Sequence, residues 1–285
     1  EGTFWPPNFS IGEAWLAHPE YEKVANGPQR FGDGRPMTGR NPTSSRIVLG
    51  PHCPLIIKHL GPVGEPKEAT HFLRLLAALG GAPHPALAAV VDGGIAPHDG
   101  EASCWMATRF VDGVCARDLL ELGPLDARRV TRILRSLAEG LARLHHRGIV
   151  HRGISPRNIV VPPTQLAVLI DYSTAHSLES PVPPSTHAAS TSAYAAPEIA
   201  AEDAGALAPP LDVYALAAVG RALLAGQSES TLPESEASDD AEARAALDAL
   251  LVQALIPNPA GRPDAAAFAA DLRAAEERFG VRPDA

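Results

Sequence analysis

The sequence predicts an α+β protein built in two lobes, a small sheet-based lobe with one helix and a larger, mainly helical lobe. Short β-branched and apolar runs, broken by Gly and Pro, fill residues 30–113. Helical periodicity dominates residues 114–285. The chain has 285 residues, 45% of them hydrophobic, which is enough for a sizeable core. Residues 1–29 are read as an N-terminal extension whose aromatic side chains are expected to pack on the same domain, with partner binding as the alternative.

The elements of the smaller lobe follow from local patterns. A turn at Gly50–His52 separates two apolar runs, and Gly80 ends a segment with apolar residues at helical spacing. The predicted helix covers Glu68–Leu79. The predicted strands cover Ser45–Leu49, Leu55–Lys58, Ala88–Val91 and Ser103–Thr108.

The larger lobe begins with a long amphipathic helix over Asp126–Arg147. Its apolar side chains recur on one face, and Gly148 stands where a left-handed cap ends a helix. Short β runs follow over Ile149–Val161 and Leu166–Ile170. Further helices are predicted over Leu211–Leu224, Ala243–Leu255 and Pro263–Phe279.

Two segments of the larger lobe have the composition of flexible chain. Residues 173–195 are rich in Ser, Thr and Pro, and residues 227–242 form an acidic, polar stretch. The first is expected to be a mobile loop and the second an acidic flexible loop, which could bind a basic partner or could simply be solvated.

The charge and composition of the chain limit the kinds of partner that it is expected to bind. Net charge is −9 and no long basic run occurs, so nucleic acid and anionic membrane surfaces are not expected partners. No apolar run approaches the roughly 20 residues that span a bilayer. Three cysteines without metal-ligand spacing favour a reducing, cytoplasmic setting. The chain starts at Glu1 without methionine, as a piece of a longer protein would.

A set of ordered motifs supplies a resemblance. Residues 151–158 read HRGISPRN, residues 171–173 read DYS, and residues 196–198 read APE, followed by Asp212 and Arg262. These resemble the H-R-D-L-x-x-x-N, D-F-G and A-P-E motifs of protein kinases. From about residue 45 to 280 the chain resembles bacterial Ser/Thr protein kinases of the eukaryotic-like type. The resemblance implies a bilobal kinase-like fold with a small antiparallel β lobe.

The resemblance also implies a site for ATP and Mg²⁺. Asp171 and Asn158 would offer oxygen ligands to Mg²⁺. Lys58 ends Leu55–Lys58 as the lysine ends the family's V-A-I-K, and would neutralise phosphate charge. Glu68 is the first candidate for its ion-pair partner and Glu65 the second.

Adenine recognition is expected at the end of the last strand of the small lobe. Thr108 takes the gatekeeper position, and the backbone of Arg109, Phe110 and Val111 would form the hinge against the base. Residues 31–34 (FGDG) with Gly39 are either a phosphate-covering glycine loop or a plain surface loop.

Other motif residues are expected to support the fold. Glu198 and Arg262 would form a buried ion pair, whose disruption costs about 3–5 kcal/mol. Asp212 would accept hydrogen bonds from the backbone of the catalytic loop. His151 would stack with Tyr172, and Arg152 could dock a phosphorylated loop.

Gly153 stands where the family has its catalytic aspartate, so no catalytic residue is assigned. General base assistance is worth about 10²–10⁴-fold, and glycine cannot supply it. Ser155 and Ser173 also depart from the family pattern, and Arg157 would replace the lost lysine charge only partly. We therefore expect a pseudokinase that binds nucleotide and a protein partner. The alternatives are a Ser/Thr kinase with residual activity and a transferase with altered chemistry.

Overall fold

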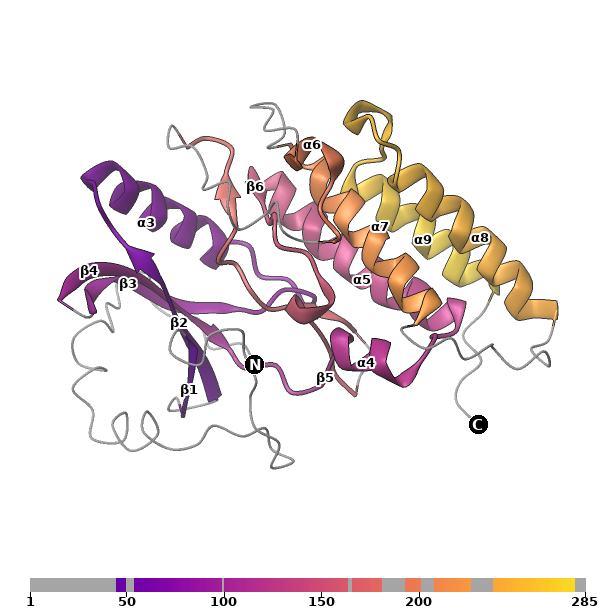
Figure 1. Cartoon of the computed structure of the whole chain (residues 1–285), viewed down its shortest axis with the longest axis horizontal. Coiled ribbons are helices and arrows are strands. Elements are labelled where there is room, and N and C mark those ends of the chain that lie inside the picture. The colour runs from indigo at the N-terminus through magenta and orange to yellow at the C-terminus, as the bar shows by residue number, and fades with distance from the viewer. Residues whose placement is uncertain are drawn as a thin grey trace. The chain divides into compact units, whose positions relative to one another are not determined.

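The computed structural model describes residues 45–49, 54–98, 100–163, 166–180, 193–200, 208–226 and 238–279 (Figure 1). The chain divides into two compact units. Unit 1 comprises Glu1–Gly81 and Ala89–Phe110, and unit 2 comprises Ala82–Ala88 and Val111–Ala285. The division therefore falls just before Gly113, where the sequence alone placed the end of the first lobe.

Unit 1 is built on an antiparallel sheet in the order β1-β2-β4-β3. Its strands are β1 (Ser45–Leu49), β2 (Pro54–Pro62), β3 (Val90–His98) and β4 (Glu101–Arg109). The predicted strand over Ala88–Val91 was wrong in both bounds. The Gly and Pro residues of β3 resemble strand breakers, but the ladder with β4 holds them in place. Pro97 is tolerated because β3 is an edge strand of the described sheet.

Helix α3 (Pro66–Gly80) packs beside this sheet (Figure 1). It begins two residues before the predicted start, because Pro66 occupies the first turn, where a missing N–H is harmless. Its buried face carries Phe72, Leu75 and Leu79. A Cβ at Gly93 would lie 2.7 Å from the Leu76 side chain, so glycine is needed there for close packing of helix on sheet.

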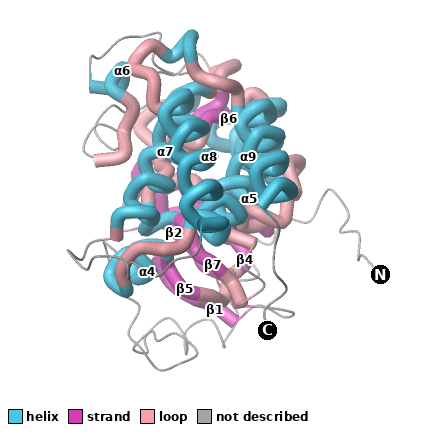
Figure 2. Tube along the Cα trace, turned by 90° about the vertical axis from the view of Figure 1, so that its right-hand side faces the viewer, coloured by secondary structure: helices cyan, strands magenta, loops and turns pink. Residues whose placement is uncertain are grey.

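Unit 2 is organised around α5 (Ala127–His146). Figure 2 shows it beside α7 (Pro210–Ala225), α8 (Ser238–Ala254) and α9 (Ala265–Phe279). The Asp126 side chain accepts a hydrogen bond from the Arg129 amide at 2.7 Å, and Gly148 has φ 66° just after the helix. Both predicted ends of α5 are confirmed. Two shorter α-helices, α4 (Ala116–Leu122) and α6 (Pro197–Ala200), and the 3₁₀ turn η3 (Pro259–Gly261) also belong to this unit.

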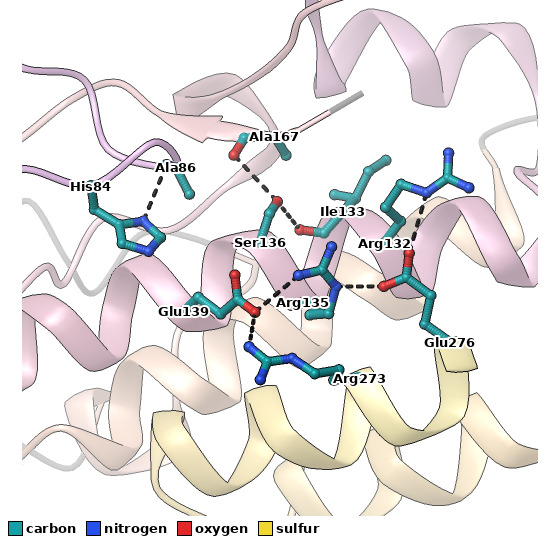
Figure 3. A network of polar contacts seen from close by, with 10 residues as sticks. All are labelled: His84, Ala86, Arg132, Ile133, Arg135, Ser136, Glu139, Ala167, Arg273 and Glu276. Atoms are coloured by element: carbon teal, nitrogen blue, oxygen red, sulfur yellow. Dashed lines mark hydrogen bonds and ion pairs between the residues drawn. The ribbon is translucent and has the colours of Figure 1, made fainter. Parts of the chain in front are cut away.

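A network of charged side chains joins α5 to α9 (Figure 3). The Glu276 carboxylate pairs with Arg135 and lies 3.4 Å from Arg132 Nε. Glu139 Oε1 lies 2.9 Å from Arg135 Nη1 and 2.6 Å from Arg273 Nη2. Burial alone would raise the pKa of Glu139, but hydrogen bonds from Arg273 and Arg135 lower it below its usual value. The network therefore favours the ionised form of the Glu139 carboxylate and fixes α9 against α5.

Short strands flank the segment that carries the kinase-like motifs. Strands β5 (Val114–Cys115), β7 (Ile159–Val161) and β8 (Val168–Leu169) form a sheet in that order. The 3₁₀ turn η1 (Pro156–Asn158) leads into β7, and β6 (Ile149–Val150) pairs with β9 (His176–Ser177). These strands confirm the short β runs that the sequence predicted around residues 149–170.

Two predicted flexible segments need correction where the structure describes them. Residues 173–195 were read as a loop, yet His176–Ser177 form β9 because they pair with β6. Residues 238–242 of the predicted acidic loop belong to α8. The sequence Ser238-Asp239-Asp240 is typical of a helix N-terminus, where carboxylates are favoured.

The remaining calls on flexible or loop segments lie outside the described residues. They are the extension 1–29, the glycine-rich segment 31–39, the turn 50–52 and residues 181–192 and 227–237. The described residues confirm an α+β fold with an antiparallel sheet in unit 1 and a mainly helical unit 2. None of the helices described is long and apolar enough to cross a membrane.

Candidate functional site

The loop after β6 is held by one buried carboxylate. Asp212 is fully buried on α7, and its Oδ2 accepts hydrogen bonds from the His151 amide at 2.8 Å and from His145 Nε2 at 2.9 Å. Its Oδ1 accepts from the Arg152 amide at 2.8 Å. Burial alone would raise the pKa of Asp212, but the bonds and charges of His145 and His151 lower it. The predicted role of Asp212 in bonding the loop backbone is confirmed.

Arg152 has an unusual backbone conformation. Its φ is 63°, and among the residues that the structure describes no other non-glycine residue has a positive φ. Such a conformation costs on the order of 1–3 kcal/mol and persists where neighbouring structure enforces it. The two amides that Asp212 binds belong to Arg152 and the residue before it, so Asp212 supplies that enforcement.

The loop contacts the turn at Asp171 through aromatic packing. The rings of His151 and Tyr172 lie 5.6 Å apart between centroids at 56° to each other. Burial lowers the pKa of His151, which favours the neutral imidazole. The Tyr172 hydroxyl donates to the carbonyl of Ala88 at 2.9 Å. The predicted contact of His151 with Tyr172 is confirmed, and the additional hydroxyl fixes the turn on its other side.

Asn158 directly precedes strand β7, and Asp171 follows the paired strand β8 by two residues. Ile159 of β7 faces Leu169 of β8, and the Ile170 amide donates to the Asn158 carbonyl at 3.0 Å. This register brings Asp171, the next residue, to the side of Asn158. Asn158 Nδ2 donates to the Gly153 carbonyl at 2.7 Å, which turns the amide oxygen the other way. An amide oxygen and a carboxylate are ligands that fit Mg²⁺.

Gly153 lies beside the hydroxyl of Thr174. A Cβ built on Gly153 would lie 2.3 Å from Thr174 Oγ1. Real Cβ atoms do not approach so closely, so any larger residue at 153 requires Thr174 to move. Thr174 Oγ1 itself donates to the His151 carbonyl at 3.0 Å. Position 153 corresponds to the aspartate of the H-R-D motif that the loop resembles. In this chain the Thr174 hydroxyl lies directly beside that position.

In unit 1 the sheet register places the predicted nucleotide residues. Lys58 of β2 faces Met106 of β4, and Thr108 lies two residues along β4, so Lys58 and Thr108 point to the same face. Thr108 is buried. Met106 also faces Gly93, against which Leu76 of α3 packs, so this is the face that α3 covers.

Glu68 caps the helix that carries it. Its Oε2 accepts hydrogen bonds from the amides of Gly64 at 2.9 Å and Glu65 at 3.1 Å, as part of a capping box. Burial, and secondarily the charge of Glu68, raise the pKa of Cys104 to about 11. Glu65 pairs with Lys67 at 2.9 Å. The ion pair of Lys58 with Glu68 or Glu65 stays a prediction.

The predicted hinge has two amides in use. The Arg109 amide donates to Ala89 at 2.8 Å, and the Phe110 amide donates to Pro54 at 2.9 Å. Because an amide N–H donates one good hydrogen bond, these two are committed within unit 1. The expected contact of the hinge backbone with adenine stays a prediction.

Glu198 and Arg262 form the expected ion pair. Arg262 Nη1 lies 2.6 Å from Glu198 Oε1 and Nη2 lies 2.8 Å from Oε2, a bidentate geometry. The Arg262 side chain is fully buried and lies 4.8 Å from the centre of the Tyr214 ring. Its Nε donates to the carbonyl of Ile256, and the same Nη1 and Nη2 also donate to the carbonyls of Pro210 and Pro257.

Two residues of the site were not singled out from the sequence. Thr174 carries the hydroxyl beside Gly153, and His145 shares the Asp212 carboxylate. His145 follows the apolar face of α5 and reads as a surface cap, so no local pattern marks it. Thr174 follows the DYS motif directly, which is a signal of place but not of partner.

Comparison with known proteins agrees with the motifs. The family described as protein kinase domain matches residues 71–266. Relatives include the serine/threonine-protein kinase PknB of Mycolicibacterium smegmatis, 30% identical over 71% of this chain and 35% of its own. A probable serine/threonine-protein kinase of Corynebacterium efficiens is 32% identical over 66% of this chain and 32% of its own. Serine/threonine-protein kinase pkn2 of Myxococcus xanthus is 31% identical over 47% of this chain and 16% of its own. The chain spans about a third of these relatives or less. With the fold, the motifs and the match in agreement, this chain belongs to the protein kinase domain family.

Proposed function

We propose that this kinase domain is a pseudokinase: a nucleotide-binding regulatory or scaffold module with little or no phosphotransfer. The observation that carries the proposal is Gly153. It has no side chain to accept a proton from an incoming hydroxyl, and Thr174 Oγ1 lies 2.3 Å from the point where that side chain would begin. A loss of about 10²–10⁴-fold is expected from the missing base alone.

The phosphate side of the site supports nucleotide binding. Asn158 and Asp171 present an oxygen donor set that suits Mg²⁺, and Lys58 shares a sheet face with the gatekeeper residue Thr108. Bound there, Mg²⁺ would neutralise the phosphate oxygens of ATP. Lys58 would add a fixed positive charge, and the hinge backbone would bond the adenine edge.

A thermal shift with ATP and Mg²⁺ tests nucleotide binding. At a hundredfold excess over Kd, a ligand stabilises the folded protein by about 2.7 kcal/mol. For a chain of this size that corresponds to a melting temperature about 5–10 °C higher. Lys58→Met and Asp171→Asn should remove the shift. Lys67→Met, which changes an exposed lysine of the same unit, should keep it. If no nucleotide stabilises the wild type, nucleotide binding is wrong.

Phosphate incorporation into the protein itself or a generic acceptor tests the lack of transfer. We expect incorporation no faster than in Asp171→Asn. Transfer by the wild type at the rate of an ordinary protein kinase, about 1–100 s⁻¹, would overturn the pseudokinase proposal.

An active serine/threonine kinase is the second candidate. The observation that favours it is that the relatives are named as serine/threonine-protein kinases. Phosphoryl transfer depends mainly on positioning and electrostatics, so a site that keeps its metal ligands can retain some rate without the base. The same incorporation assay separates the two candidates.

The partner in either case is proposed to be a protein. A module that binds nucleotide without transferring phosphate would act through a contact that changes with nucleotide. The free thiols Cys104 and Cys115 suit the cytoplasmic setting expected from the sequence.

A further inference from the structure

We propose that Thr174, together with Gly153, accounts for the loss of the catalytic base. The Thr174 hydroxyl lies too close to position 153 for a side chain to begin there. The loop therefore cannot accept an aspartate at 153 until Thr174 is shortened. The consequence for phosphotransfer rests on the proposed function, but the steric coupling of the two positions does not.

The obstacle to a side chain at Gly153 is one atom. A Cβ there would lie 2.3 Å from Thr174 Oγ1, whereas the next nearest atoms, Asn158 Nδ2 and His151 Nδ1, would lie at 3.6 Å, an ordinary contact distance. Every other atom of Thr174 is therefore farther away than those two. Removing the hydroxyl oxygen would be enough to make room.

The backbone at Gly153 does not require glycine. The described glycines with positive φ are Gly61, Gly100, Gly123, Gly148 and Gly226, and Gly153 is not among them. Its φ therefore lies outside the left-handed region, where an L residue would be strained. Replacement by a residue with a side chain should cost nothing in backbone conformation.

Thr174 cannot yield without loss. Its Oγ1 donates to the His151 carbonyl at 3.0 Å, and its own carbonyl accepts from Arg152 Nη1 at 3.4 Å. Two residues earlier, the Tyr172 hydroxyl is bonded to Ala88 at 2.9 Å. Rotating the Thr174 side chain would break the bond to His151. The position of the hydroxyl is thus fixed by the same loop whose side chain it excludes.

A thermal double-mutant cycle tests this coupling without any ligand. Gly153→Ala in the wild type should lower the melting temperature by about 3–10 °C, the range expected for overpacking. In a Thr174→Ala background the same change should have little effect or a small stabilising one. Thr174→Ser is the matched control: it keeps the hydroxyl and its bond to the His151 carbonyl, so Gly153→Ala should still destabilise.

The outcomes separate cleanly. Destabilisation by Gly153→Ala that disappears with Ala at 174 and persists with Ser at 174 supports the proposal. An equal effect of Gly153→Ala in all three backgrounds, or no effect in the wild type, overturns it. These readouts do not depend on ATP, so they stand even if the nucleotide proposal fails.

Phosphate incorporation then tests the functional consequence. Gly153→Asp with Thr174→Ala should transfer phosphate at least about tenfold faster than Gly153→Asp alone. Equal rates in the two variants would overturn the role of Thr174 while leaving the pseudokinase proposal intact. If neither variant transfers, restoration of function by these two positions is wrong, and the thermal cycle still decides the steric coupling.

Discussion

Replacing Arg262 by methionine should destabilise unit 2 severely. The guanidinium is fully buried and bonds both oxygens of Glu198, at 2.6 and 2.8 Å. It also donates to three backbone carbonyls, those of Ile256, Pro257 and Pro210, at 2.7, 2.8 and 3.2 Å. Methionine fills much of the same volume but leaves the Glu198 carboxylate and these carbonyls without their donor.

The expected magnitude follows from that burial. Breaking a buried ion pair by removing one partner costs about 3–5 kcal/mol. At about 2–4 °C per kcal/mol, the melting temperature should fall by about 6–20 °C. Glu198→Gln should lose less, because the side-chain oxygen and the three carbonyl bonds of Arg262 remain.

The assay is thermal unfolding followed by circular dichroism, with Arg117→Met as the control. Arg117 pairs with Glu121 within unit 2, but at 3.8 Å and with about half of each side chain exposed. Exposed pairs of this kind contribute about 0–1 kcal/mol. If Arg262→Met loses no more stability than Arg117→Met, the inference from buried geometry to stability is refuted.

Two other predictions concern the loop and its turn. Burial lowers the pKa of His151, so this histidine binds a proton more readily in the unfolded chain than in the folded one. Its contribution to the free energy of unfolding should be complete above about pH 6.5. Below that pH the free energy of unfolding should fall by up to about 1.4 kcal/mol per pH unit for one such group. Asp212, whose pKa is also lowered, should add a second loss below about pH 4. Urea midpoints that stay level from about pH 7 to 4 would contradict the first prediction, and midpoints that do not fall further below about pH 4 would contradict the second. Tyr172→Phe removes the buried bond to Ala88 and should lower the melting temperature by about 2–6 °C; an unchanged value would mean that the hydroxyl contributes nothing.

Elements with complete local signals could be predicted from the sequence closely. Helix α5 has a capping aspartate, a continuous apolar face and a left-handed glycine, and both its ends agree with the structure. Strand β3 lacks such signals. Its sequence, VVDGGIAPH, contains three residues that disfavour strands, and it forms because β4 pairs with it along its length.

The candidate site divides in the same way. Motif order located Asp212, Glu198 and Arg262, and their contacts agree with the expected roles. The contact between Gly153 and Thr174 could not be predicted, because it depends on how the turn at Asp171 folds back over the loop. Likewise, nothing near Tyr172 in the sequence indicates that Ala88 accepts its hydroxyl bond.

The hydrogen bonds from the loop backbone to Asp212 have a consequence for protein engineering. Its oxygens bind the amides of His151 and Arg152, which every residue type except proline possesses. The course of the main chain is therefore specified independently of the functional groups that the loop displays. The side chains of the loop could therefore be replaced in an engineered variant without changing the path of its backbone, which Asp212 of α7 would continue to hold.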